Sequence, residues 1–134
     1  MSDLERAPEC LGSFELPRYA ERLGVLLQPG KRTSRRKAVG ALAHFSGWRE
    51  ECAHGVPSFL QQPAALEEYV TMEGARSTCY VLSEDPDIDD RRVALRTALD
   101  KLLGSGMGSL LVLSPSPMAL YLGEETGVVT FLKR

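Results

Sequence analysis

The sequence has little cysteine, no asparagine and few lysines. Its three cysteines, Cys10, Cys52 and Cys79, are odd in number and widely spaced. This pattern is not that of a small secreted domain held by disulfides, and it favours reduced thiols in the cytoplasm. We interpret the absence of asparagine, and the excess of arginine over lysine, as a coding bias and not as a functional signal.

The sequence also lacks a recognisable targeting or membrane segment. Charged residues occur throughout the first ten positions, so no signal peptide is predicted there. The uncharged run over residues 107–123 is interrupted by Pro115 and Pro117, which excludes a membrane-spanning helix. We therefore expect a cytoplasmic protein without a membrane partner.

The length and composition predict one globular domain. The chain has 134 residues, of which 43% are hydrophobic and 25% charged. A chain of this size buries roughly two-thirds of its surface on folding and needs neither a disulfide nor a metal for stability. We expect residues 1–134 to form a single domain, with residues 1–14 flexible.

Apolar residues at three- and four-residue intervals predict four helices, over residues 17–27, 34–53, 64–74 and 90–103. Gly40 and Gly47 weaken the second helix, so an interruption near Gly47 is an alternative. Asp89 or Asp90 is expected to cap the fourth helix by accepting hydrogen bonds from its first N–H groups.

Runs rich in apolar and β-branched residues predict four strands, over residues 77–83, 109–114, 118–123 and 127–133. The order of elements is N-terminal helices followed by a β-α-β-β-β unit that ends in an antiparallel meander. This order predicts an α+β fold with helices packed on the sheet.

The last three predicted strands are apolar at consecutive positions, so both of their faces are apolar. An antiparallel sheet with one face in water alternates polar and apolar residues. Both faces of this sheet therefore need cover, either by the helices of the chain or by a second copy or partner protein. We also expect the strand at 127–133 to lie at a sheet edge, where a partner strand could pair with it.

Two short segments carry opposite charge. Residues 31–37 hold five basic side chains and residues 84–90 hold five acidic ones. Basic side chains at a helix start oppose the helix dipole, so local helix stability does not explain them. They are expected to contact an acidic protein surface or nucleic-acid phosphates, unless they are solvated or pair with the acidic segment of the same chain.

Several chemical motifs are incomplete. The glycines of residues 104–108 follow a helix and precede a strand, the reverse of a phosphate-binding loop, so we predict a helix end and a link. The acidic run places Asp90 and Arg96 where a calcium loop needs glycine and a bidentate acid. The histidines and cysteines lack zinc-ligand spacing, and no hydrolase motif is present.

We therefore predict a non-catalytic protein-binding module, such as an adaptor, inhibitor or immunity-type protein, with a protein partner and a possible homodimer. It acts through the apolar sheet face or the edge strand, and we expect neither cofactor nor metal. One alternative is nucleic-acid binding through residues 31–37, and another is a small enzyme with a Cys/His or acidic site. The candidate binding residues are Arg32, Arg35, Arg36, Lys37, Trp48, Tyr121 and Phe131.

Overall fold

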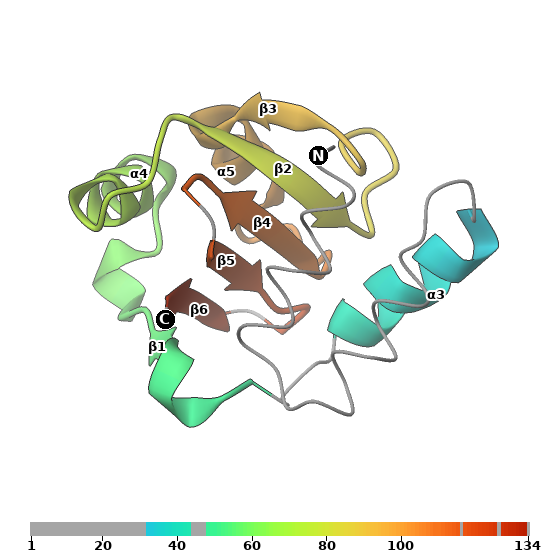
Figure 1. Cartoon of the computed structure of the whole chain (residues 1–134), viewed down its shortest axis with the longest axis horizontal. Coiled ribbons are helices and arrows are strands. Elements are labelled where there is room, and N and C mark those ends of the chain that lie inside the picture. Colours follow the sequence, from blue (N-terminus) through green and yellow to red (C-terminus); the bar gives the residue numbers. More distant parts are fainter. Residues whose placement is uncertain (1–31, 44–47, 116, 126, 134) are drawn as a thin grey trace.

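The computed structural model describes residues 32–43, 48–115, 117–125 and 127–133 (Figure 1). The helix predicted over residues 17–27 and the flexible segment predicted over residues 1–14 lie outside the described residues. Elements keep the labels of Figure 1.

A six-stranded antiparallel sheet forms the centre of the fold, with the strand order β1-β6-β5-β4-β2-β3. The strands are β1 (Ala53–Gly55), β2 (Thr78–Ser83), β3 (Arg92–Ala94), β4 (Ser109–Leu113), β5 (Met118–Leu122) and β6 (Val129–Lys133). The α+β class and the C-terminal meander β4-β5-β6 agree with the prediction.

Both faces of the central strands are buried, and alternate residues of each strand belong to different hydrophobic clusters. In β4, Leu111 and Leu113 lie in one cluster, whereas Leu110 and Val112 lie in the other. Every residue of β4 and β5 is buried within the single chain. The apolar sheet faces are thus core and not an open binding surface.

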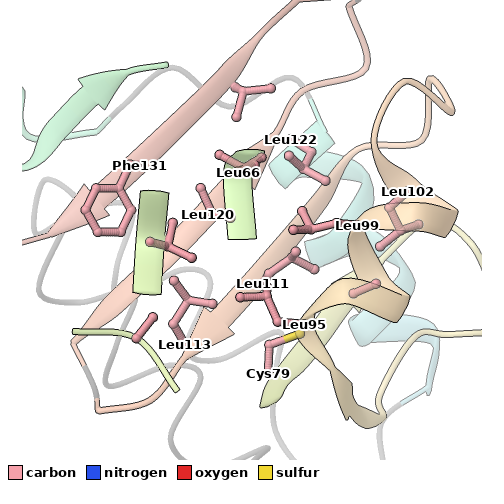
Figure 2. Close-up of a cluster of buried hydrophobic side chains, with 14 of the residues drawn as sticks. Leu66, Cys79, Leu95, Leu99, Leu102, Leu111, Leu113, Leu120, Leu122 and Phe131 are labelled. Atoms are coloured by element: carbon pink, nitrogen blue, oxygen red, sulfur yellow. The ribbon is translucent and has the colours of Figure 1, made fainter. Parts of the chain in front are cut away.

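Two helices cover the first face of the sheet. Helix α4 (Pro63–Met72) contributes Leu66 and Val70 to this cluster, and α5 (Leu95–Leu102) contributes its whole apolar stripe. Figure 2 shows Leu95, Leu99 and Leu102 of α5 directed toward the strands. The spacing of three and four residues brings these leucines to one side of the helix, where they exclude water from the sheet.

Helix α3 (Arg32–Ala43) packs at the second face and lies to one side of the sheet in Figure 1. Its Ala38 joins the cluster that contains Tyr80 and Leu110, together with Cys52 from the short 3₁₀ helix η1 (Glu50–Cys52). A second 3₁₀ helix, η2 (Ser58–Leu60), leads into α4.

Two predicted helices have wrong bounds. Within the range predicted as one helix, 34–53, the described residues form α3 up to Ala43, then η1 and the start of β1 at Ala53. Gly47, the alternative point of interruption, lies outside the described residues. The helix predicted over 90–103 begins at Leu95, because residues 92–94 form β3. Asp89 and Asp90 do not cap it: its N-cap position is Ala94, without a side-chain cap.

The prediction that the last strand lies at a sheet edge is wrong. Strand β6 pairs with β5 on one side and with β1 on the other. The edges are β1 and β3, which have three residues each. Edge strands this short offer few free backbone groups to an incoming strand. No helix among the described residues is long and apolar enough to span a membrane.

Candidate functional site

The predicted basic segment supplies the first half of α3, where the structure separates Arg35 from the other cationic residues. The first turn of α3 contains no acidic residue that would balance the helix dipole. Arg35 is half-buried and directed at the loop that follows β2, whereas Arg32, Arg36 and Lys37 are exposed.

Arg35 forms a bidentate ion pair with Asp89. Its Nε donates to Asp89 Oδ2 at 2.9 Å, and its Nη2 donates to Asp89 Oδ1 at 3.0 Å. Asp89 Oδ1 also accepts a hydrogen bond from the backbone N–H of Ser83 at 3.0 Å. The two side chains are only 12% and 21% exposed, so this pair is better shielded from water than an ordinary surface pair.

Tyr80 and Asp90 extend this ion pair. The Tyr80 hydroxyl donates to Asp90 Oδ1 at 2.6 Å, and the Arg35 guanidinium lies 5.7 Å from the centre of the Tyr80 ring. Burial and the hydrogen bond to Asp90 raise the pKa of Tyr80, which keeps the phenol protonated as a donor. Burial alone would lower the pKa of Arg35, but the hydrogen bond to Asp89 and the neighbouring charges raise it overall.

The remaining cations of α3 have no such partner. Among the described residues, no carboxylate lies within ion-pair distance of Arg32, Arg36 or Lys37. Residue 31 lies outside the described part of the chain. The basic segment therefore divides into one residue that holds α3 to the β2–β3 loop and three that present charge to solvent.

A groove of about 360 Å³ separates α3 from the β2–β3 loop. The α3 wall consists of Arg36, Val39 and Gly40, and the opposite wall comes from the loop. This wall consists of Ser83, the last residue of β2, and the loop residues Glu84, Pro86 and Asp89. This groove brings the basic and acidic segments of the sequence together.

The acidic loop is braced by its own hydrogen bonds. Asp85 is buried; its N–H donates to Ser83 Oγ at 3.0 Å, and its Oδ1 accepts from the N–H of Asp87 at 3.0 Å. Lys101 of α5 pairs with Asp85 at 3.6 Å and with Asp87 at 3.9 Å. Among the described residues no group of three or more His, Cys, Asp and Glu side chains is arranged to hold a metal ion.

Among the described residues, the two cysteines are buried, whereas the histidine is exposed. Cys52 and Cys79 are both buried, and burial, opposed by the charge of Arg92, raises the pKa of Cys79 to about 12. Cys79 is therefore protonated at neutral pH and is a poor nucleophile. His54 lies exposed on β1, with its ring 6.5 Å from that of Phe131. His44 lies outside the described residues.

The three aromatic candidates lie in or against the core. Tyr121 and Phe131 are each only 2% exposed, and Trp48 is half-buried with its ring 5.3 Å from that of Tyr121, edge to face. Phe131 packs against Tyr69 at 5.6 Å. These aromatic residues stabilise the sheet and its cover, and they do not belong to the groove beside α3.

The glycine run at 104–108 ends α5 and leads to β4, in the order that the sequence predicts. Gly104 and Gly106 have positive φ values of 78° and 77°, a conformation that glycine adopts without strain. They line a hollow of about 260 Å³ with the β5–β6 turn, and its lining includes Glu124 and Glu125 but no basic residue. Those charges disfavour phosphate there.

No protein-family model, curated protein or solved structure matches the chain. Sequence reasoning identified the cationic wall of the groove but missed Tyr80, Val39, Gly40 and Pro86. The opposite charges of the two segments were the signal that pointed to their meeting. Tyr80 and the apolar lining of the groove carried no comparable signal.

Proposed function

We propose that the protein is a non-catalytic module that binds another protein through the exposed basic surface of α3, formed by Arg32, Arg36 and Lys37. The observation that supports this proposal is the contrast with Arg35, which has a dedicated partner in Asp89 while these three residues have none among the described residues. Cations placed against the helix dipole destabilise the free helix. An anionic partner would offset that cost.

An acidic protein suits this surface better than nucleic acid does. The exposed carboxylates of Glu84 and Asp87 lie on the loop that faces α3, and the whole chain has a net charge of −2. A continuous phosphate backbone that crossed this region would meet those carboxylates. A protein surface carries its charges at separate positions. It can therefore place acidic side chains opposite the cations of α3 and neutral side chains opposite the acidic loop.

The sheet does not enter this proposal, because its faces are buried and its edge strands are short. We also propose a reducing, cytoplasmic location, in keeping with the free thiols of Cys52 and Cys79. Whether the module acts as an adaptor, an inhibitor or an immunity-type protein follows from the identity of its partner. Sedimentation of the purified protein tests the possible homodimer.

The proposal is tested by affinity capture from the cells that make the protein, with and without nuclease, followed by titration of the purified partner. We expect a protein partner that survives nuclease treatment and binds the variant R32E/K37E at least about tenfold more weakly, since like charges across an interface are costly. The control is R76E, at the opposite end of β2 from the groove. Equal binding by R32E/K37E and wild type contradicts the proposal, and a nuclease-sensitive complex favours nucleic-acid binding instead.

A further inference from the structure

The groove beside α3 has one free charge at its cationic wall. Both oxygens of Asp89 accept hydrogen bonds from Arg35, and Oδ1 also accepts one from Ser83 N–H. Glu84 Oε1 accepts a hydrogen bond from the N–H of Gly108 at 2.8 Å. The Arg36 guanidinium has no carboxylate partner among the described residues, so it is the lining group most in need of an acceptor.

The two walls of the groove differ in charge, and this difference determines the orientation of a charged occupant. A negative group is favoured beside the guanidinium of Arg36 and disfavoured beside the carboxylate of Glu84 on the opposite wall. The occupant must therefore carry its charge on the α3 side and a neutral portion on the loop side. A discrete acidic side chain meets this condition, whereas a uniform polyanion does not.

The rest of the groove suits a small apolar portion. Val39 is buried beneath the groove, and Pro86 lies exposed on the loop. Between them, Gly40 lies within a twelve-residue helix, and a Cβ atom built there would meet no atom within 4 Å. Glycine lowers the stability of a helix interior relative to alanine, and neither backbone conformation nor intrachain packing requires it at this position. Its absence of a side chain lets a ligand approach the helix backbone.

We infer that this groove receives an extended segment of the partner, with an aspartate or glutamate paired to Arg36 and an adjoining small apolar residue on Val39, Gly40 and Pro86. This inference rests on the proposed function and names the chemistry of the partner. It makes Gly40 the specificity-determining position, because the space above its Cα is the space that the apolar residue fills.

A displayed library of random dodecapeptides provides the probe. Peptides selected on the purified full chain are expected to share an acidic residue next to a small apolar one. Gly40→Phe fills the groove from a position with free space around it, and we expect it to weaken binding of the selected peptides at least tenfold. Gly40→Ala is the matched control and retains binding within about threefold.

A second variant tests the contribution of the Arg36 charge separately from that of the free space at Gly40. Arg36→Gln removes the exposed cation without touching the core and is expected to weaken the same peptides at least fivefold, while Arg76→Gln leaves them unchanged. Circular dichroism and thermal unfolding establish that each variant is folded. If Gly40→Phe does not fold, Gly40→Leu replaces it as the variant that fills the groove.

The outcomes distinguish the inference from the proposed function. If R32E/K37E weakens the selected peptides but Gly40→Phe and Arg36→Gln do not, the groove inference is overturned and the α3 surface remains the binding site. If none of the three variants has an effect, both fail. Selection of basic peptides, or of no peptide at all, also overturns the groove inference.

Discussion

Arg35 in α3 and Asp89 in the loop after β2 lie 54 positions apart in the chain, yet their side chains meet in a bidentate ion pair at 2.9 and 3.0 Å. This pair attaches the basic helix to the acidic loop, and its Asp89 also lines the groove between them. It also leaves the neighbouring cations of α3 available to a partner. The proposed function depends on this division of the basic segment.

Removal of Asp89 should destabilise the protein more than removal of an exposed acid. Asp89→Ala leaves the half-buried Arg35 without its carboxylate and the Ser83 N–H without its acceptor, so we expect the free energy of unfolding to fall by about 2 kcal/mol. Asp100→Ala is the control, because Asp100 pairs with Arg96 on an exposed helix face, where a loss below about 0.5 kcal/mol is expected. Urea unfolding measures both. Equal effects of the two substitutions would show that the Arg35–Asp89 pair does not hold α3 in place.

Replacement by alanine should change the free energy of unfolding in opposite directions at two glycines, Gly40 and Gly104. Gly40 lies in a helix with free space around it, so Gly40→Ala is expected to raise the free energy of unfolding by about 1 kcal/mol. Gly104 has a φ of 78°, so Gly104→Ala is expected to lower it by about 1 kcal/mol. Thermal or urea unfolding checks the pair. If Gly104→Ala stabilises the protein, Gly104 does not have the left-handed backbone conformation described after α5. If Gly40→Ala destabilises it, the space around Gly40 is not open.

The buried thiol of Cys79 should make the protein less stable at alkaline pH. Its pKa is raised from 9.0 to about 12, first because burial disfavours the thiolate. Above about pH 9 the unfolded chain loses this proton while the folded protein keeps it, so the unfolded state binds fewer protons and stability falls with pH. The loss approaches about 1.4 kcal/mol per pH unit for this group and continues up to the folded pKa. At lower pH the thiol contributes no pH dependence.

The variant Cys79→Ala isolates this contribution. It lowers stability at every pH, because it removes buried sulfur, but it should lack the part of the alkaline decline that belongs to the thiol. Urea unfolding at pH 8 and at pH 10.5 gives the two slopes. If wild type and Cys79→Ala lose the same free energy over this interval, Cys79 does not stay protonated in the folded protein.

The fold class followed from the sequence because its strongest signals are local. The apolar runs at 109–114 and 118–123 and the leucine spacing after Leu95 specify buried strands and an amphipathic helix without reference to the rest of the chain. Strands β1 and β3 were missed because each has only three residues. Pairing with distant strands, and not their own composition, makes them strands.

The predicted helix over 34–53 failed for an instructive reason. Ala38 and Cys52 belong to the same buried cluster, with Trp48 packed against it, so their regular spacing did reflect a shared core. Among the described residues, however, Ala38 lies in α3, whereas Cys52 lies in the separate 3₁₀ helix η1. An apolar period shows that residues are buried together, but it does not show that one continuous helix buries them.

Only part of the candidate site was accessible from sequence. The opposite charges of residues 31–37 and 84–90 permitted their pairing, but charge counts do not select Arg35 over Arg36 as the residue that pairs. That choice follows from helix phase: Arg35 faces the β2–β3 loop beside Tyr80, while Arg36 faces the groove. The phase became known only once α3 was placed on the sheet.

The salt dependence of binding to the purified, nuclease-treated partner tests the central claim most directly. If the basic surface of α3 meets an acidic protein, the affinity of wild type falls steadily between low and high salt, because exposed charges are screened over about 10 Å at 0.1 M ionic strength. In the variant R32E/K37E the affinity is lower, and this fall is largely gone, while R76E behaves as wild type. Binding that is insensitive to salt and equal in R32E/K37E and wild type would contradict the account.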